Sequence, residues 1–366
     1  MSALKSVEAI AKRCLALVAA ALLWRPWRGR HLAAALAAPK RILLVRIDER
    51  IGEALLTTAM LSTLKRHRPI PQVDVLVHPR VLRVLAGHPE LDHLVPFERY
   101  LLPLGPLAPS IRSLRRARYD VIFNCGNWST PSVTSAVVAR LAGPRSAIVG
   151  PRTWPTSWLH SVSVSPRTDT VEEVAQRVHL LSVLPGHSPS ERISFRKPRP
   201  REEFRPFTAE LVGTEYGVLY PGGRLDWRRI PPEIFRCAAQ ALSDLRIRPI
   251  VAWGPGEKQI ATLVADKVEG ARLAPETDLD DLAALIQSSQ LCICNNTGPM
   301  HLAVAVGTPT LGLFYRMDSA RWGHSYPPHR MIDLTGVLER GAEALERVRG
   351  EVESFAIRLR SQRGQS

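Results

Sequence analysis

Residues 291–314 read LCICNNTGPMHLAVAVGTPTLGLF, and their pattern indicates the class of fold. Its first four residues are an apolar run typical of a buried strand. The turn residues Asn-Asn-Thr-Gly-Pro follow, and an Ala- and Val-rich segment from Met300 predicts a helix. Residues 310–314 predict a second buried strand. The order strand, tight turn, helix, strand indicates a parallel sheet with helices on its faces.

The turn at residues 295–299 is a candidate phosphate site. A helix that begins directly after a strand presents free backbone N–H groups and the positive end of its dipole. The small residues Thr297 and Gly298 let an anion approach the backbone, and His301 would lie beside that anion in the first helical turn. The alternative is an ordinary strand–helix joint in which an Asn caps the helix.

Length and charge narrow the function classes. The chain has 366 residues, enough for two ordinary domains. Its hydrophobic fraction of 45% excludes a disordered chain. The formal net charge of +15 favours an acidic partner, which would be nucleic acid, anionic lipid or a phosphorylated substrate. The scattered cysteines indicate reduced thiols of a cytosolic protein; they are Cys14, Cys125, Cys237, Cys292 and Cys294.

Residues 1–39 predict a basic, apolar N-terminal helical segment. Its longest apolar run, residues 14–24, is short for a membrane span, which needs about 20 residues. A signal peptide is disfavoured, because a basic block occupies the position of the cleavage region. Two interpretations stay open. The helix lies in a membrane surface with Trp24 and Trp27 at the headgroup level, or it packs on the body of the protein.

After residue 40, apolar strand-like runs alternate with helical patterns, and the alternation occurs twice. The first half has predicted strands at residues 41–46, 73–77, 94–95, 121–124 and 146–149, with helices at 54–67, 81–85, 111–118 and 132–141. The second half has predicted strands at residues 217–220, 249–253, 291–294 and 310–314, with helices at 232–243, 257–268, 279–288 and 336–360. This alternation predicts an α/β protein with two doubly wound, Rossmann-like parallel sheets.

A shift to Pro, Ser and Arg within residues 185–206 marks the boundary between the halves. The predicted division is a first domain at 40–190, a linker at 191–206, a second domain at 207–335, and a C-terminal helix and tail at 336–366. In doubly wound sheets, ligands bind outside the carboxyl ends of the strands. We therefore expect the two domains to face a cleft that holds the ligand.

The first ligand loop expected in the second half is residues 221–231, PGGRLDWRRIP, directly after a strand. Gly222 and Gly223 allow a close backbone approach. Arg224, Arg228 and Arg229 can neutralise phosphate. The alternative is a solvated basic loop, which a strongly basic protein is expected to have.

The second loop is residues 254–257, GPGE. Its carboxylate, Glu257, suits a ribose diol, although a Glu at a helix start also interacts favourably with the helix dipole. With the turn at residues 295–299, three such loops at successive strand ends favour a nucleoside diphosphate ligand.

The sequence holds no glycine pattern of the phosphate-loop type, and no G-x-G-x-x-G follows the first strand. No cluster with metal-ligand spacing occurs either, so we expect no bound metal. His301, His324 and His329 are separated by Arg- and Pro-rich sequence. Each is predicted to be an isolated polar histidine.

Four segments resemble the glycosyltransferase family that holds the bacterial lipopolysaccharide heptosyltransferases, family nine. The most specific is CNNTGPMHLAVAVGTPTLGLF, similar to the family's Asp-Thr-Gly-Pro-x-His signature. The other three are RILLVRIDERIGEALLTTAMLSTLKRHRP, GVLYPGGRLDWRRIPPEIF and VAWGPGEKQIA. The resemblance implies the GT-B architecture, with the acceptor on the first Rossmann-like domain and the nucleotide-sugar on the second. It also implies an inverting transfer of heptose from an ADP-sugar to the lipopolysaccharide core.

The resemblance also implies roles for individual residues. Glu53 takes the position of the family's acidic general base, and Arg46 and Arg50 beside it are expected acceptor contacts. Arg228 takes the position of the family's phosphate-binding Lys, and Glu257 takes the position of its ribose-binding Glu. The implied nucleotide-sugar contacts are Gly222, Gly223, Arg228, Glu257, Asn296, Thr297, Gly298 and His301.

The chain departs from the family pattern at Glu53 and Asn296, where the family has Asp, and at Arg228 and Ile230, where Lys and Trp are usual. Two rivals therefore stay open: a related transferase using another nucleotide-sugar for O-antigen or capsule, and a non-catalytic member that binds a glycolipid. Nucleic-acid binding is not expected, because no recognition motif occurs.

The expected partners are a nucleotide-sugar, ADP-heptose, and an anionic glycolipid acceptor, with no tightly bound cofactor. The expected location is the cytoplasm, peripheral on the inner face of the cytoplasmic membrane.

Overall fold

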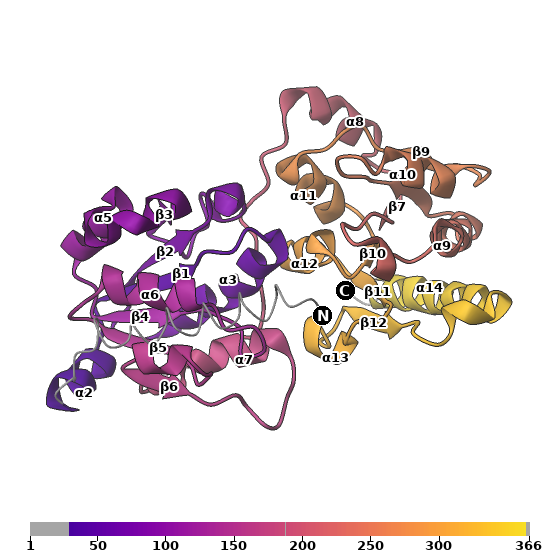
Figure 1. The fold of residues 1–366 in the computed structure, drawn as a ribbon. Coiled ribbons are helices and arrows are strands. Elements are labelled where there is room, and N and C mark those ends of the chain that lie inside the picture. The colour runs from indigo at the N-terminus through magenta and orange to yellow at the C-terminus, as the bar shows by residue number, and fades with distance from the viewer. Residues whose placement is uncertain (1–28, 187, 364–366) are drawn as a thin grey trace. The chain divides into compact units, whose positions relative to one another are not determined.

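The computed structural model describes residues 29–186 and 188–363. These residues form two compact units that divide between Ile193 and Ser194, drawn in Figure 1 with colours that run from indigo to yellow along the chain. Most of the predicted N-terminal segment lies outside the described residues. Its last part contains helix α2 (Gly29–Ala37).

The first unit is built on a six-stranded parallel sheet with the order β3-β2-β1-β4-β5-β6. Its central strand β1, RILLVR, has four side chains with no exposed surface, from Ile42 to Val45. Such a run suits a strand that is covered on both faces. The strands are β1 (Arg41–Arg46), β2 (Gln72–Val77), β3 (His93–Pro96), β4 (Val121–Asn124), β5 (Ala147–Pro151) and β6 (Val162–Val164).

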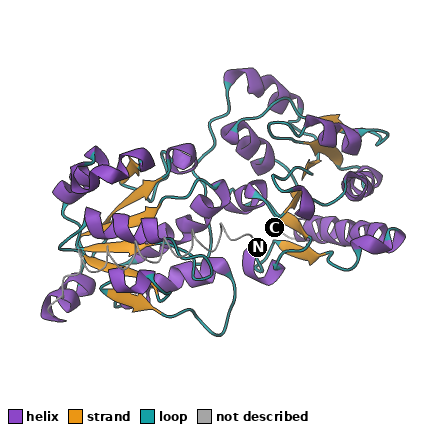
Figure 2. Cartoon of the chain, in the orientation of Figure 1, coloured by secondary structure: helices purple, strands orange, loops and turns teal. Residues whose placement is uncertain are grey.

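Helices cover both faces of this sheet, as Figure 2 shows. Right-handed crossovers place the helices that lead from β1 to β3 on one face and those that lead from β3 to β5 on the other. The first set is α3 (Ile51–Arg66) and α4 (Leu82–Leu85), and the second is α5 (Pro109–Ala117) and α6 (Val133–Ala142). Helix α7 (Glu173–His179) packs against α3. The 3₁₀ helices are η1 (Pro79–Val81), η2 (Arg99–Leu107), η3 (Thr156–Leu159) and η4 (Leu180–Val183).

The second unit repeats this plan with the sheet order β12-β11-β10-β7-β8-β9, again all parallel. The strands are β7 (Tyr216–Tyr220), β8 (Arg248–Val251), β9 (Arg272–Leu273), β10 (Leu291–Asn295), β11 (Thr310–Phe314) and β12 (Arg330–Asp333). The helices are α8 (Arg205–Glu210), α9 (Pro232–Asp244), α10 (Lys258–Ala265), α11 (Leu279–Gln287), α12 (Gly298–Ala305), α13 (Ser319–Trp322) and α14 (Ala342–Arg363), with 3₁₀ turns η5 (Glu202–Phe204), η6 (Asp226–Arg228) and η7 (Leu338–Arg340). The two sheets confirm the predicted α/β fold with two doubly wound halves.

The C-terminal helix α14 belongs to the core of the second unit. It packs on α9, and its inward side chains, among them Val348, Val352 and Phe355, join the same apolar cluster as Phe235 of α9. Residues 336–363 therefore share one core with the sheet that precedes them.

Helix α7 of the first unit was not predicted from the sequence. Helix α3 also begins at Ile51, so Glu53 lies in its first turn and not in the preceding loop. Residues 99–107, where no helix was predicted, form the 3₁₀ helix η2. The short strands β6, β9 and β12 were missed as well.

Among the described residues, no helix combines the length and the apolar character needed to cross a bilayer. The cysteines of the described part are free thiols, at Cys125, Cys237, Cys292 and Cys294.

Candidate functional site

Three loops of the second unit meet at one edge of its sheet. They follow β7, β8 and β10, which are neighbours in the sheet. Because the strands are parallel, their carboxyl ends lie at the same edge, where ligands of doubly wound folds bind. The structure thus brings together the three loops that the sequence analysis selected.

The glycine-rich loop after β7 is anchored by hydrogen bonds to Asn295, the last residue of β10. The buried Asn295 amide donates to the carbonyl oxygens of Pro221 at 2.6 Å and Gly222 at 3.1 Å. Its Oδ1 accepts from the backbone N–H of Ile230 at 3.3 Å. One side chain therefore fixes both ends of the loop. Sequence reasoning selected the adjacent Asn296 instead, although a polar residue closing an apolar strand was the available signal.

The arginines of this loop have different surroundings. Arg229 donates from Nε to the carbonyl oxygen of Gly223 at 3.0 Å and pairs with Asp226 at 2.7 Å. Arg229 therefore stabilises the loop. Arg228 ends the short helix η6 and is partly buried, whereas Arg224 is exposed.

Glu257, after β8, is held against the glycine loop. Its Oε2 accepts from the Tyr220 hydroxyl at 2.9 Å and from the backbone N–H of Gly254 at 3.0 Å. Burial, together with the Glu257 carboxylate, raises the pKa of Tyr220, so the phenol stays a donor. A Cβ atom added to Gly222 would overlap the carboxylate of Glu257. Residue 222 must therefore be glycine if Glu257 is to keep this position.

We expect Gly222→Ala to weaken nucleotide binding by about 10- to 100-fold, the effect of losing hydrogen bonds to a charged group. The added methyl group displaces the flexible end of Glu257 and no backbone atom, so the free energy of unfolding should fall only by about 1–3 kcal/mol, through the lost hydrogen bonds from Tyr220 and Gly254. Calorimetric titration with a nucleotide measures the loss. In a Glu257→Ala background the same substitution should cost nothing further; an equal loss there would contradict this explanation.

The turn after β10 adjoins the glycine loop, since a Cβ atom on Gly223 would lie 3.3 Å from Thr297 Cγ2. Thr297 precedes α12 as its N-cap residue, in an extended conformation and without a side-chain cap. The alternative of an Asn cap is therefore wrong. The half-buried Asn296 donates its backbone N–H to the carbonyl oxygen of Leu313 at 3.2 Å. In the first turn of α12, Pro299 has no N–H and the N–H of Met300 donates to the carbonyl oxygen of Thr297 at 3.1 Å, so the candidate donors for an anion there are the amides of Thr297 and Gly298.

His301, in the first turn of α12, is not isolated, and that prediction was wrong. Its Nδ1 lies 2.9 Å from Nε2 of His324, which follows α13, and both rings are buried. The rings meet edge to face, and those of Tyr326 and His329 lie close to His324. Within the described ranges, no group of three or more His, Cys, Asp or Glu side chains is placed to hold a metal ion.

The buried His324 predicts a pH effect on stability. Burial, with smaller contributions from His301 and His329, holds the pKa of His324 well below 6.5. The unfolded chain therefore binds one more proton below about pH 6.5, and stability falls as the pH drops. His324→Gln should remove one proton's worth of this slope, about 1.4 kcal/mol per pH unit. Urea denaturation between about pH 5 and pH 7.5 measures it; an unchanged slope would show that His324 does not titrate on unfolding. Replacing the exposed His31 is the control.

In the first unit, Glu53 is the centre of a buried ionic cluster. Its Oε2 accepts from Arg46, at the end of β1, and from Arg177 of α7. Its Oε1 lies 2.8 Å from Nη2 of Arg50 and accepts from Nδ2 of Asn127 at 3.3 Å. A carboxylate has about four lone-pair positions, and these donors occupy all of them.

Arg177, which the sequence analysis missed, is fully buried and connects α7 to α3. It donates to the Glu53 carbonyl oxygen at 2.8 Å and to Asn127 Oδ1 at 3.1 Å. It also pairs with Glu173, one helical turn earlier, at 3.3 Å. That i, i+4 pair was the available sequence signal.

The cluster keeps Glu53 ionised. Burial alone would raise the pKa of Glu53, but Arg177, Arg46 and Arg50 together hold it well below its usual value. Arg46 is itself buried and also contacts Asp48 at 2.7 Å and Asn127 at 3.1 Å. Arg50 differs, because 49% of its side chain is exposed. It is therefore the partner of Glu53 that a ligand can most readily engage.

Comparisons with known proteins agree on one family. The model of glycosyltransferase family 9 (heptosyltransferase) matches residues 109–343. Lipopolysaccharide heptosyltransferase 3 of Escherichia coli is 26% identical over an alignment of 291 positions, which covers 74% of this chain and 82% of that protein. Lipopolysaccharide heptosyltransferase 1 of Campylobacter coli is 22% identical over an alignment of 314 positions, which covers 80% of this chain and 89% of that protein.

Two solved structures share the fold. The glycosyl transferase family 9 protein from Veillonella parvula superposes with a TM-score of 0.71 at 18% identity, covering 88% of this chain and 99% of that one. The E. coli heptosyltransferase WaaC with ADP gives a TM-score of 0.63 at 20% identity, covering 83% and 99%. At these identities the likeness shows the fold, which is the predicted GT-B architecture.

Proposed function

This chain belongs to glycosyltransferase family 9, the heptosyltransferase family, and we propose that it transfers heptose from ADP-heptose, with inversion, to a lipopolysaccharide core or a related anionic glycolipid. Relatives at 22–26% identity are lipopolysaccharide heptosyltransferases, and one structural neighbour was solved with ADP. The observation that carries the proposal is the convergence of Glu257, the glycine loop and the Thr297 turn at one sheet edge.

In the proposed donor site, Glu257 accepts from the ribose hydroxyls. The backbone of Gly222 and Gly223 approaches the diphosphate, which the amides at Thr297 and Gly298 and the start of α12 also bind. Arg228 neutralises the charge that develops on the departing ADP. Asn296 and His301 complete the set of proposed contacts.

In the proposed acceptor site, a hydroxyl oxygen of the acceptor attacks the anomeric carbon while the bond from that carbon to the diphosphate breaks. The hydroxyl proton passes to Glu53, the proposed general base. An anionic group of the acceptor draws the half-exposed Arg50 away from Oε1 of Glu53, which frees that oxygen and raises its basicity. Arg46, being buried, positions Glu53 and is not the direct acceptor contact.

The same proposal assigns the acceptor to the first unit and the nucleotide-sugar to the second. It requires no resident metal or cofactor, because arginine and backbone donors stabilise the leaving group. The enzyme would act on the inner face of the cytoplasmic membrane, and residues 1–39 are one candidate for contact with the lipid.

Calorimetric titration of ADP, UDP and GDP into the full chain tests the donor. Binding of ADP alone, followed by ADP-heptose-dependent glycosylation of a core acceptor, is the expected result. Nuclear magnetic resonance of the product then reports its anomeric configuration. Preferential binding of UDP or GDP would overturn the donor assignment in favour of an O-antigen or capsule enzyme. Product with a retained configuration would overturn the inverting mechanism.

A further inference from the structure

The first unit carries an exposed surface that the proposed reaction does not use. It consists of the exposed residues of η2 and α5, within residues 99–118, and is called the η2–α5 surface below. Its apolar part is formed by three exposed side chains of η2: Tyr100 is 75% exposed, Leu104 51% and Leu107 71%. No other run of eight described residues exposes three large apolar side chains.

The rest of the surface is basic. Helix α5 turns Ile111 and Leu114 into the core of the unit, which leaves Arg112, Arg115 and Arg116 exposed. Arg99 and Arg118 extend the charge at the two ends, and residues 99–118 contain no Asp or Glu.

The fold itself does not require this exposure. The inner side of the segment is anchored by Ala108, Ile111 and Leu114, all buried in one cluster. Single exposed apolar residues are ordinary on protein surfaces, but a contiguous group marks an interaction site. Here that group adjoins the exposed arginines, the combination found where a protein lies on an anionic membrane. One carboxylate lies beside it, that of Glu98, which accepts from the Tyr100 hydroxyl at 3.2 Å.

We propose that the η2–α5 surface docks the protein on an anionic lipid bilayer. Tyr100 takes the headgroup level, where amphipathic rings are favoured. Leu104 and Leu107 enter the boundary between headgroups and acyl chains, and the arginines of α5 bind lipid phosphates. The chemistry favours lipid over nucleic acid, because a phosphate backbone offers no apolar layer for the two leucines.

The η2–α5 surface and the Glu53 cluster lie at the same edge of the first sheet. Helix η2 follows the carboxyl end of β3, and the Glu53 cluster follows the carboxyl end of β1, so both start from one edge of the sheet. The two strands are separated only by β2, which corresponds to roughly 10 Å. Leu101 of η2 and Ile47 after β1 pack against the same core cluster. Docking would therefore bring the edge that carries Glu53 close to lipids of the bound leaflet.

Co-sedimentation of the full chain with vesicles tests the proposal. The vesicles contain phosphatidylethanolamine with phosphatidylglycerol, and vesicles of phosphatidylcholine alone are the neutral comparison. The variant R112E/R115E/R116E should lose binding by about 100-fold, at about fivefold or more for each arginine. The variant L104S/L107S keeps the charge and should lose about tenfold or more. High salt should weaken wild-type binding.

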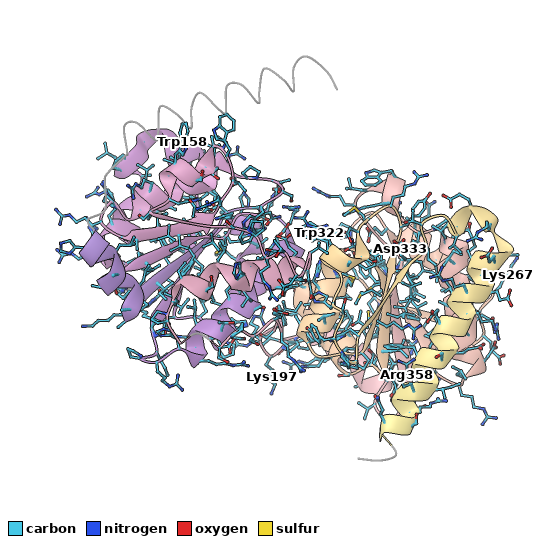
Figure 3. All side chains as sticks on the ribbon, turned by 90° about the horizontal axis from the view of Figure 1, so that it is seen from below. Trp158, Lys197, Lys267, Trp322, Asp333 and Arg358 are labelled. Atoms are coloured by element: carbon cyan, nitrogen blue, oxygen red, sulfur yellow. The ribbon has the colours of Figure 1, made fainter. Side chains whose placement is uncertain are left out.

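The matched control is R205E/R347E/R358E, which makes the same change in net charge at exposed positions of the second unit; Figure 3 labels Arg358 on α14. It should bind vesicles like the wild type. Circular dichroism checks that all variants are folded. Wild-type binding by both η2–α5 variants would overturn the proposal and assign any membrane contact to another segment, such as residues 1–39. Equal binding to neutral vesicles would overturn its electrostatic part.

The proposal is separable from the transferase function. With a water-soluble, deacylated acceptor, both η2–α5 variants should turn over like the wild type, because no membrane is involved. A loss of activity on that soluble acceptor would mean that the surface binds the acceptor sugar, and would overturn membrane docking as its role. Vesicle binding itself needs neither donor nor acceptor, so its outcome stands whether or not heptose is the sugar transferred.

Discussion

Glu53→Gln is expected to lower turnover by about 10²- to 10⁴-fold, the usual contribution of a general base. It should also lower the free energy of unfolding by about 3–5 kcal/mol, because Arg46 and Arg177 would lose the carboxylate that they share, and each buried charge would keep only one acidic partner, Asp48 or Glu173. The glutamine amide would in addition place N–H donors against guanidinium donors. Single-turnover kinetics and urea denaturation measure the two effects.

The same variant has a pH signature. The pKa of Glu53 in the folded protein lies below the ordinary value of 4.5, so its stabilising effect is complete above about pH 5 and is lost as the pH falls through the folded pKa. Wild type and Glu53→Gln should therefore become more alike in stability under acid conditions.

Two controls separate the roles of the carboxylate. Glu53→Asp keeps the charge, so it should retain most of the stability and reveal what placement alone contributes to turnover. Arg50→Gln removes only the half-exposed partner, so it should cost little stability and mainly raise KM for the acceptor. If Glu53→Gln turned over at the wild-type rate, Glu53 would not be the base.

The second large effect is expected at Arg228. Arg228→Ala should lower kcat/KM by about 10²- to 10³-fold, as the loss of one donor aimed at developing charge does. Affinity for ADP should fall as well, since a charged hydrogen bond to a phosphate contributes about 1.5–3 kcal/mol. Steady-state kinetics and calorimetry of one preparation give both values.

Arg224→Ala is the matched control, because it removes an exposed arginine from the same loop and changes the net charge equally. It should affect ADP binding less than tenfold, mostly at low salt. Equal losses in the two variants would mean that the loop acts through its overall charge, and Arg228 would have no specific role.

The sequence predicts well those elements in which the apolar pattern and the flanking turn or polar residues indicate the same structure. The strands β1, β4 and β11 were predicted residue for residue, because each is a run of buried apolar residues bounded by turn or polar positions. Strands β6 and β9 have three residues and two residues, too few for any periodic pattern. Helix α7 was missed because it buries polar residues, Glu173, Gln176 and Arg177, which hides the apolar stripe of an ordinary helix.

The candidate site also has parts that the sequence predicts and parts that it does not. The donor loops were predictable, because parallel strands put their carboxyl ends at one edge whatever the details of packing. The contact between His301 and His324 was not, since it joins residues 23 positions apart through the path of the chain after β11. The partners of Glu53 likewise come from β1, α7 and the loop after β4, and no local pattern indicates that these segments meet.

The hydrogen bonds between Asn295 and the loop after β7 limit how the sequence of this loop can change during evolution. A loop transplanted from another transferase would be anchored only if the recipient strand ended in an amide able to donate to two carbonyls and accept from one N–H. An aspartate there could accept but could not donate. The loop and the last residue of β10 are therefore inherited as one module, although 65 positions separate Ile230 from Asn295. Libraries that vary residues 221–231 to change donor preference should vary residue 295 with them.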